Sequence, residues 1–405
     1  MNQCYCGSCE LTEYSSKYDR CKACNTLVSR HHFAPDISKV TSEEKDLYGS
    51  HYWEKTMVQE AGVKDLDALI DLYIPERAAY WLKYCLQNLA LGAKAAEVGC
   101  GLGQLSYMLK SAGFHMTSFE LSPQICHYVE QRLDLRIVCG ELCSSQEKYQ
   151  AILAMDVFEH LPDPDKFLQD CSERLEPDGI LVLQTPCYNP VYTYEEMLVK
   201  QPRFQHLLVE EQHVFLYSRE SIVHLLKRHG FTHVIFEPAF FGNDYDMFLF
   251  ASKAPFGRNT AEEIDDYLNH VPNGRMVKAL FRLLDEKNQE MDQRRAIDEQ
   301  RNIVLKDMDI LNQLVQEKET QIAQYKKAAQ ERLEDIYKLT DQNAVLKHEA
   351  DRRLADIERL LEENKLLKHE ADQRLADVEK LTSENAVLEQ AANDRLAIIE
   401  RMKNE

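Results

Sequence analysis

The chain has 405 residues, and 48 Lys and Arg against 68 Asp and Glu give a formal net charge of -20. This charge argues against a protein that binds nucleic acid, because neutralising a phosphate backbone requires a basic surface. The length predicts two or three domains at roughly 150 residues each. No apolar run reaches about 18 residues and no charged-then-apolar leader opens the chain, so we expect a cytosolic protein without a membrane span.

Cysteines gather at the amino terminus. Five of the twelve cysteines lie within the first 24 residues. In a cytosolic protein such a cluster indicates a metal site rather than disulfides. Two C-x-x-C pairs have the spacing of a structural zinc site, so we predict a zinc-binding knuckle over residues 1–40. The predicted ligands are Cys6, Cys9, Cys21 and Cys24, with Cys4 as an alternative in the first pair.

Apolar runs alternate with amphipathic stretches over residues 45–255. We expect strands at 94–98, 115–120, 135–139, 151–155, 180–185, 233–236 and 246–251, and helices at 75–90, 104–112, 122–132, 164–175 and 218–229. This alternation predicts an α/β domain with a Rossmann-like, mostly parallel sheet of seven strands covered on both faces. The last two strands have no helix between them, which predicts an antiparallel pair at one edge.

A glycine loop follows the first expected strand and opens a helix. Its pattern is E-x-G-x-G-x-G, formed by Glu97, Gly99, Gly101 and Gly103. Glycines let the backbone approach a ligand closely, and the free N–H groups of the helix face it. A dinucleotide fingerprint would need glycine at position 104, where this chain has Gln104. Glu120 ends the next strand, where a carboxylate can accept both ribose hydroxyls of NAD or of an adenosyl ligand.

Three further segments follow the glycine loop in order. They are DVFEHLPDP (156–164), LEPDGILVLQTP (175–186) and EQHVFLYSRESIVHLLKRHGF (211–231). With them, residues 45–255 resemble the class I S-adenosylmethionine-dependent methyltransferases. The resemblance implies that the methionine half of the cofactor lies among Glu97, Gly99, Gly101 and Gly103, the ribose at Glu120, adenine near Leu121 and Glu141, and the sulfonium beside Asp156.

Two histidines are candidates for proton transfer to an acceptor. His160 follows Glu159 directly after the fourth strand, and His213 begins a later apolar run. Histidine is the side chain best suited to take a proton near neutral pH. We therefore predict that His160, His213 and the adjacent Glu159 are catalytic. Together with Asp156 they also resemble the metal-binding set of quinone-biosynthesis O-methyltransferases and small-RNA terminal 2′-O-methyltransferases. That resemblance implies a Mg²⁺ or Mn²⁺ ion, and a histidine acting as a plain base stays open.

The last third of the chain is nearly free of glycine and proline. Residues 256–296 are expected to form a helical connector, and from 297 the apolar residues hold a heptad register that predicts a coiled coil over 297–405 with 21-residue repeats. Such a rod would extend about 160 Å at 1.5 Å per residue. We therefore predict a homo-oligomer joined by a parallel coiled coil. Asn at a positions favours two strands, and small Ala and polar Arg layers leave three strands open.

The order of these parts carries a second resemblance. A zinc knuckle before this fold resembles the nucleotide-sugar C-methyltransferases, and the trailing coiled coil resembles bacterial polysaccharide methyltransferases that cap a glycan. These resemblances imply O-methylation of a sugar, a glycan acceptor, a glycosyltransferase docked on the rod, and a cytoplasmic protein held at the inner membrane through that partner. An aromatic acceptor lid is expected at Tyr188, Tyr192, Tyr194 and Phe204. The alternatives are an RNA or quinone-type O-methyltransferase and a non-catalytic, cofactor-binding scaffold.

Overall fold

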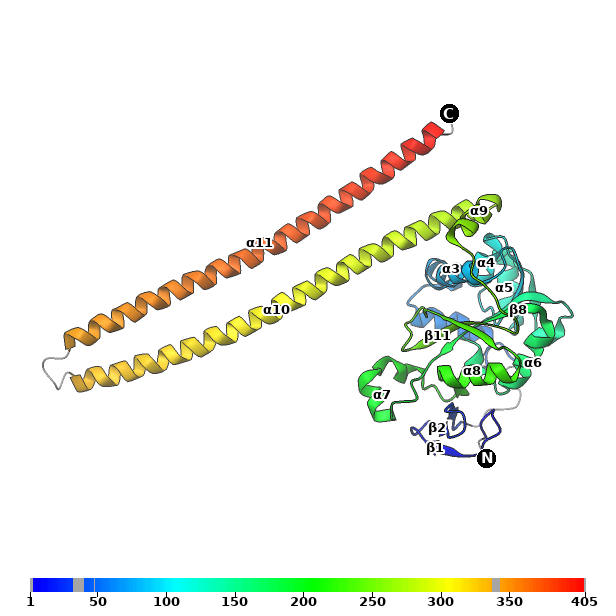
Figure 1. Ribbon diagram of the computed structural model, residues 1–405, viewed down its shortest axis with the longest axis horizontal. Helices are drawn as coiled ribbons and strands as arrows, with labels where there is room; N and C mark the ends of the chain where they lie inside the picture. The colour runs from blue at the N-terminus through cyan, green and yellow to red at the C-terminus, as the bar shows by residue number, and fades with distance from the viewer. Residues whose placement is uncertain (1–2, 32–39, 47, 337–342, 404–405) are drawn as a thin grey trace. The chain divides into compact units, whose positions relative to one another are not determined.

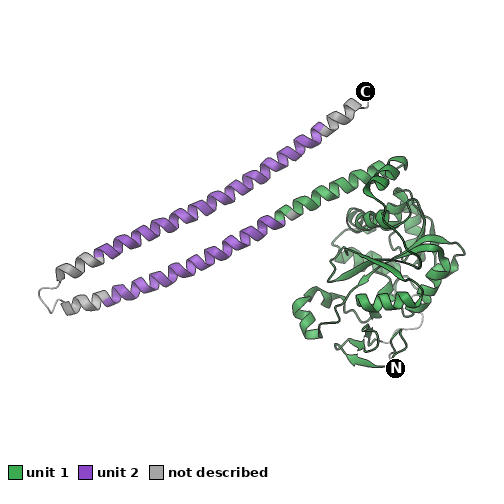
Figure 2. Cartoon of the chain, viewed as in Figure 1, with its two compact units in different colours: residues 1–294 green, residues 295–405 purple. Residues whose placement is uncertain are grey.

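The computed structural model describes residues 3–31, 40–46, 48–336 and 343–403, and within them the side chains of all but 292, 329–350 and 396–403. The chain divides into two compact units, Met1–Arg294 and Arg295–Glu405 (Figure 2). In the described ranges no helix combines the length and the apolar character needed to cross a lipid bilayer.

A seven-stranded sheet forms the centre of the first unit, in the order β10-β11-β8-β7-β4-β5-β6 (Figure 1). The strands are β4 (Lys94–Val98), β5 (His115–Glu120), β6 (Ile137–Cys139), β7 (Tyr149–Met155), β8 (Leu175–Pro186), β10 (His233–Glu237) and β11 (Asp246–Ser252). The five strands from β6 to β8 run parallel, and β11 and β10 pair antiparallel at the other edge. The predicted sheet and its antiparallel edge are thus confirmed.

Helices cover both faces of this sheet (Figure 1). They are α3 (Ala79–Asn88), α4 (Gln104–Ser111), α5 (Pro123–Leu133), α6 (Pro164–Arg174) and α8 (Arg219–Arg228). Successive strand residues point to opposite faces, so Leu153 packs in the core beneath α3 and α4 while Ile152 packs in the core beneath α6 and α8. This arrangement leaves the carboxyl ends of the parallel strands free to line a site.

Several elements were not expected from the sequence. The region before β4 is built from η1 (Tyr52–Met57), α1 (Val58–Glu60), α2 (Leu66–Tyr73) and η2 (Ile74–Ala78), and later short helices are η3 (Leu142–Ser144), η4 (Phe158–His160), α7 (Tyr194–Lys200) and η5 (Pro202–Leu207). The expected helix at 75–90 is therefore a π-helical turn followed by α3. Its first residues pack against α4 and carry Arg77 toward the cavity described below.

A second, smaller sheet joins the amino terminus to a distant part of the chain. Its order is β1 (Leu11–Glu13), β2 (Tyr18–Cys21), β3 (Leu27–Ser29) and β9 (Phe215–Leu216). All of its pairings are antiparallel. The cysteine-rich segment is therefore built into the same unit as the large sheet, because its last strand pairs with β9.

The expected connector forms α9 (Ala261–His270) and the start of α10 (Gly274–Ile336), and α11 (Asn343–Lys403) follows. Thr260 caps α9 by accepting from the Glu263 N–H. The helical part of the rod prediction is confirmed in the described ranges, and the predicted continuity across 337–342 lies outside the described residues. Leucines at predicted d positions are exposed in this single chain, for example Leu360 at 51% and Leu381 at 61%. Pairing of the rod stays a prediction.

Candidate active site

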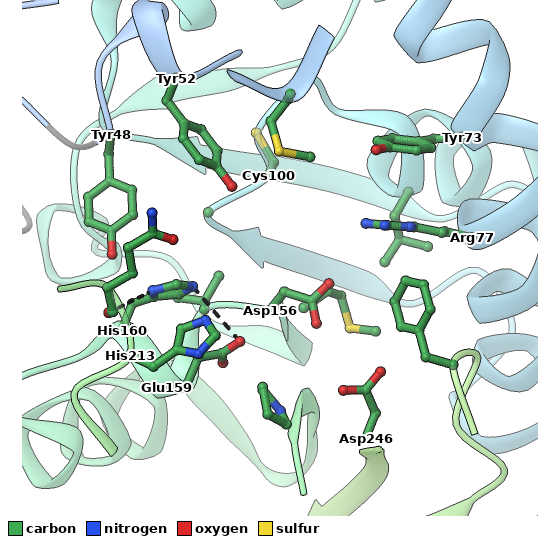
Figure 3. A pocket seen from close by; sticks show the side chains of 18 of the residues that line it. Tyr48, Tyr52, Tyr73, Arg77, Cys100, Asp156, Glu159, His160, His213 and Asp246 are labelled. Atoms are coloured by element: carbon green, nitrogen blue, oxygen red, sulfur yellow. Dashed lines mark hydrogen bonds and ion pairs between the residues drawn. The ribbon is translucent and has the colours of Figure 1, made fainter. Parts of the chain in front are cut away.

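A cavity of about 750 Å³ opens at the carboxyl ends of β4, β5 and β7 (Figure 3). It brings together most of the side chains that the sequence analysis selected. The predicted cofactor residues on its wall are Glu97, Gly99, Glu120, Leu121 and Asp156, and the predicted catalytic residues there are Glu159, His160 and His213. One cavity therefore holds both the predicted cofactor end and the predicted proton-transfer end.

The glycine loop needs glycine for both conformation and space. Gly99, Gly101 and Gly103 have φ values of 65°, 51° and 74°, in the left-handed region that other residues rarely adopt. A Cβ on Gly101 would lie 2.4 Å from the Trp53 ring, and one on Gly99 would lie 2.6 Å from Val157. Trp53 thus covers Gly101, and neither Gly101 nor Gly103 is among the cavity-lining residues.

Two buried carboxylates stand at this end of the cavity. Glu120 accepts hydrogen bonds from the backbone N–H groups of Gly101 (2.9 Å) and Leu121 (2.8 Å). Burial raises the pKa of Glu120, and it raises the pKa of Glu97 to about 7 while the Ser106 hydroxyl, which donates to Glu97 over 2.5 Å, opposes this rise. The Ser122 N–H also donates to Glu120, over 3.2 Å. A carboxylate has about four acceptor positions, so about one remains for a ribose hydroxyl.

The residues present fit an adenosyl cofactor. The glycine cradle has no room for a Cβ, and the Gln104 side-chain nitrogen is buried beside it without a hydrogen-bond partner. Buried donors in folded proteins nearly always have a hydrogen-bond partner, so a bound ligand would supply the acceptor that this nitrogen lacks. Glu141, by contrast, is exposed and is not among the residues on the cavity wall. One of its carboxylate oxygens lies 3.8 Å from Lys166 Nζ. This position differs from the expected one near adenine.

Asp156 is held by a chain of buried hydrogen bonds. The Trp81 indole N–H donates to the Gln184 side-chain oxygen over 2.7 Å, and the Gln184 amide donates to Asp156 over 3.0 Å. Asp156 has a φ of 54°, an unusual conformation for a residue with a side chain. The hydrogen bond from Gln184 fixes the carboxylate in the middle of the cavity (Figure 3).

Replacing Trp81→Phe should lower the free energy of unfolding by about 1–3 kcal/mol, because the Gln184 oxygen would remain buried without a donor. Chemical denaturation checks this. Gln184→Met removes that oxygen but also the donor to Asp156, so the double variant should be destabilised by less than the sum of the two single effects. A double variant that is destabilised by the sum of the two single effects would contradict the coupling.

Glu159, His160 and His213 form a compact cluster at the other end of the cavity, where their ligand atoms lie within 4.8 Å of one another (Figure 3). His160 Nδ1 is 3.0 Å from the Gln212 carbonyl oxygen, and His213 Nδ1 is 2.6 Å from that of Leu207. A carbonyl only accepts, so each Nδ1 carries the proton and each Nε2 presents a lone pair.

Electrostatics keep both imidazoles neutral. Burial, together with the neighbouring His213, lowers the pKa of His160 to about 3, and burial lowers the pKa of His213. Burial and the nearby charge of Asp156 raise the pKa of Glu159, whose Oε2 accepts from Thr185 over 2.9 Å. The cluster therefore offers two basic nitrogens and a carboxyl group that a proton or a cation would stabilise.

The ligand set differs from the expected one at Asp156. Its carboxylate is turned toward Gln184, and the clustered ligand atoms are those of Glu159 and the two histidines. One carboxyl group and two imidazoles remain. This set of donors can bind Mn²⁺ and related ions, and the imidazoles can also act as a base. The donor atoms fit a divalent ion without Asp156.

Two cavity residues were missed by the sequence analysis. Asp246 begins β11 and is 2% exposed, with one carboxylate oxygen that lacks a partner. The Tyr48 hydroxyl is also buried without a partner, and its ring meets His160 edge-on at 5.8 Å. No motif marks either residue, because each comes from a segment far from the glycine loop in sequence. Both residues line the cavity, so a bound molecule could supply the missing partners.

Replacing Asp246→Asn should stabilise the protein increasingly as the pH rises. Burial and the charge of Asp156 raise the pKa of Asp246 to about 8, while Arg77 opposes the rise. At pH values between the ordinary pKa of aspartate and about 8, the Asp246 carboxyl group is protonated in the folded state and ionised in the unfolded state. The free energy of unfolding of the wild type therefore falls as the pH rises through this range. The advantage of the variant should grow by about 1–3 kcal/mol from pH ~6 to ~8 and then level off.

Thermal unfolding of both proteins across this pH range measures the difference. The matched control is Asp244→Asn, which changes a nearby exposed aspartate and should give a constant difference. A pH-independent effect at Asp246 would contradict a raised pKa at this position.

The amino-terminal thiols form a second cluster, made of Cys4, Cys6, Cys21 and Cys24. Cys4 Sγ lies 3.5 Å from Cys24 Sγ, and Cys6 Sγ lies 3.6 Å from Cys21 Sγ. Four sulfurs at 2.3 Å from a tetrahedral zinc ion are about 3.8 Å apart, so the donors fit zinc. Cys9 is exposed and outside the group, so the geometry favours the alternative ligand, Cys4, over Cys9.

The expected aromatic lid has a different role. Tyr188 and Phe204 are at most 1% exposed and pack in one apolar cluster with Tyr14 and Tyr18 of the cysteine-rich segment. They hold that segment against the large domain and are not among the cavity-lining residues. From the same stretch of chain, the cavity wall includes Arg203 and His206.

Comparison with known proteins agrees with this site. Residues 70–235 match a family model described as a methyltransferase domain. The match covers about two fifths of the chain. The glycine loop, Glu120 and the Glu159–His160 pair all lie within the matched range, whereas the cysteine-rich segment and the rod lie outside it.

Curated relatives match a shorter stretch of the chain than the family model does. The chain is 35% identical over 114 residues to the ubiquinone biosynthesis O-methyltransferase of Xylella fastidiosa (strain 9a5c), covering 26% of this chain and 46% of the relative. It is 30% identical over 113 residues to the protein of the same name from Coxiella burnetii (strain Dugway 5J108-111), covering 26% and 48%. The chain therefore spans about half the length of the curated relatives it matches.

Among solved structures, similar chains include the magnesium protoporphyrin IX methyltransferase of Synechocystis PCC 6803 with bound S-adenosylhomocysteine. That chain is 16% identical, with a TM-score of 0.36 and coverage of 50% of this chain and 97% of that one. A glycopeptide N-methyltransferase complexed with S-adenosylhomocysteine is 15% identical, with a TM-score of 0.35 and coverage of 44% and 90%.

Proposed function

We propose that the protein is an S-adenosylmethionine-dependent O-methyltransferase that acts on a sugar hydroxyl of a bacterial cell-surface polysaccharide. One observation supports this most: the glycine loop with Glu120 and the Glu159, His160 and His213 cluster line the same cavity. When bound, the cofactor supplies an activated methyl group. The protein then has to hold an acceptor oxygen close to it and remove the hydroxyl proton.

The chain's own residues can perform these tasks. Glu120 and the glycine loop would hold the adenosyl and methionine parts, and Asp156 lies between them and the histidines. The Nε2 lone pair of His160 or His213 would accept the proton of the acceptor hydroxyl. Each Nδ1–H donates to a backbone carbonyl, which stabilises the imidazolium that forms.

The composition of the cavity supports a sugar acceptor. Aromatic rings on its wall include Tyr48, Tyr52, Tyr73, Phe241 and Tyr245. Aromatic faces pack against the C–H faces of sugar rings, and carboxylates such as Asp246 accept hydrogen bonds from hydroxyl groups. A net charge of -20 favours a neutral glycan over a phosphate-rich polymer.

A divalent ion is the alternative means of activating the acceptor. Glu159, His160 and His213 would bind Mg²⁺ or Mn²⁺, which lowers the pKa of a coordinated hydroxyl group. Methyl transfer that stops after chelation and returns with added Mg²⁺ or Mn²⁺ supports this version. Transfer that continues at the same rate after chelation supports histidine as a plain base.

A quinone-type acceptor is a second candidate, supported by the curated relatives. Proteins named for ubiquinone biosynthesis match 113 or 114 residues of this chain at 30–35% identity. The apolar and aromatic side chains on the cavity wall also fit a phenolic ring. Less than half of each relative is matched, so we rank the quinone-type acceptor second, after a sugar.

A transfer assay separates these functions. The full-length protein is incubated with methyl-labelled donor and three acceptors: a lipid-linked oligosaccharide, a prenylated catechol and a single-stranded RNA. Label in the oligosaccharide supports the proposal, and label in the catechol or RNA alone overturns the choice of sugar. Cofactor binding without transfer to any acceptor would support a non-catalytic scaffold instead.

We also propose that the helices of residues 297–405 join copies of this chain in a parallel coiled coil. Apolar side chains at predicted d positions, such as Leu367 (53% exposed) and Leu388 (65%), lack burial within one chain. A repeat of such residues every seven positions needs a second helix to cover it. Glutamates and lysines between them keep the other faces of the helices soluble.

The variant Leu367→Asp/Leu388→Asp should separate the oligomer into monomers in analytical ultracentrifugation. The matched control is Leu366→Asp/Val387→Asp, which moves both changes one residue earlier to outward-facing c positions of similar exposure, 65% and 66%. The control should sediment like the wild type. Wild-type protein that sediments as a monomer would contradict the coiled coil.

A further inference from the structure

The cysteine-rich segment contacts the part of the chain that carries His213. In β3, Leu27 pairs with Leu216 and Val28 with Phe215, so the small sheet ends on the two-residue strand β9. A strand this short has little stability of its own and depends on its partner. The position of β9 is therefore set largely by β3.

Two hydrogen bonds extend this contact to the histidine itself. The Tyr18 hydroxyl, fully buried, donates to the His213 carbonyl oxygen over 2.9 Å, and the Ser29 N–H donates to the Val214 carbonyl oxygen over 3.0 Å. On the other side, the Val214 N–H donates to the Glu159 carbonyl oxygen over 2.8 Å. The segment at 213–214 thus lies between the small sheet and the loop that carries Glu159 and His160.

The same segment also orients His160. Its Nδ1 faces the carbonyl oxygen of Gln212, the residue before His213. The Ser29 hydroxyl donates to the Glu210 carbonyl oxygen over 2.8 Å, so the cysteine-rich segment holds the backbone on both sides of Gln212. A shift of β3 would therefore change the orientation of both imidazoles.

The four thiols gather beside the turn that leads into β3. Cys21 ends β2, and Cys24 lies in the turn that leads from β2 to β3. The other two ligands, Cys4 and Cys6, precede β1. A segment with so few residues cannot bury a core of its own, so a tetrahedral ion bound to all four thiolates would fix the turn.

We propose that the four-cysteine site is a metal-dependent brace for the histidine site: zinc bound by Cys4, Cys6, Cys21 and Cys24 holds β3, which in turn holds β9 and His213. Tyr18 is the positioning residue that links the two. This inference rests on the proposed role of the histidines. The glycine loop is fixed separately by Glu120 and by packing against α5, so cofactor binding should not depend on the brace.

Hydrogen–deuterium exchange of the full-length protein tests the brace without relying on activity. Wild-type protein should contain one zinc per chain. Cys21→Ser should lose the zinc, and its amides at 207–217 should exchange at least about tenfold faster, while those of β4 and α4 stay as in the wild type. Calorimetry with S-adenosylhomocysteine should give an affinity within about threefold of the wild type.

Tyr18→Phe provides the second variant, in case Cys21→Ser does not fold. It should keep its zinc, exchange faster at 213–216 and lower the rate of methyl transfer at saturating acceptor. Tyr80→Phe is the matched control, since it also removes a tyrosine hydroxyl bond to a backbone carbonyl, that of Pro238 at 2.7 Å. It should match the wild type in all three measurements.

Three results would overturn the brace: wild-type protein without zinc, unchanged exchange at 207–217 in zinc-free Cys21→Ser, or equal exchange in Tyr18→Phe and Tyr80→Phe. Absence of methyl transfer in the wild type would count against the proposed function alone. The exchange measurements would still decide whether the thiol site orders the histidine segment.

Discussion

A protein with His160→Ala or His213→Ala should transfer methyl groups about 10²–10⁴-fold more slowly than the wild type, which is the usual contribution of a general base. Each change removes one of two neutral imidazoles whose ligand atoms lie within 4.8 Å of each other and of the Glu159 carboxyl group. The affinity for S-adenosylhomocysteine should stay within about threefold, because the glycine loop and Glu120 are unchanged. Initial rates at saturating donor, with calorimetry of the product, measure both quantities.

The double variant separates a cooperating pair from two independent groups. If the imidazoles act as one unit, removing both should cost little more than removing one. The matched control is His224→Ala, which removes an exposed histidine from α8 and should leave the rate unchanged. A His160→Ala protein within about threefold of the wild-type rate would show that the cluster is structural.

Glu120→Ala should weaken the binding of S-adenosylmethionine by about 10- to 100-fold. A hydrogen bond to a charged group contributes roughly 1.5–3 kcal/mol, and about one acceptor position of the carboxylate remains for the ribose. The change also removes the acceptor for the Gly101 and Leu121 N–H groups, so the loop itself should loosen. Calorimetry with donor and product measures the loss.

Two further variants define the role of Glu120. Glu120→Gln keeps one acceptor oxygen, so its affinity should lie between those of Glu120→Ala and the wild type. Glu130→Ala removes an exposed carboxylate from α5 and should bind the cofactor normally. Normal binding by folded Glu120→Ala would place the adenosyl group elsewhere.

The large sheet and the cofactor end of the site were predictable because their signals are local. Strand and helix periodicity, the glycine spacing and the carboxylate after β5 each occupy a few consecutive residues. The boundaries of the elements were less predictable. For example, β8 begins at Leu175, which is the last residue of the expected helix, because the strand starts before its apolar run. Short helices before β4 carry no sustained periodicity and were missed.

The remaining errors come from contacts between distant residues. Cys9 fits a C-x-x-C pattern, yet the chain around β1 turns Cys4 and Cys6 toward Cys21 and Cys24 instead. Asp246 enters the cavity because β11 runs antiparallel beside β8, and no spacing rule predicts that neighbour. Tyr188 was assigned to the acceptor lid, but the cysteine-rich segment covers it.

The chain has two tryptophans, and both line the cavity. Trp53 covers Gly101 of the cofactor loop, whereas Trp81 is tied through Gln184 to Asp156. Any molecule that enters must alter the surroundings of an indole, so intrinsic fluorescence will report occupancy without an added dye. Because no other indole contributes background emission, a spectral change on titration with donor or acceptor can be assigned to this one cavity.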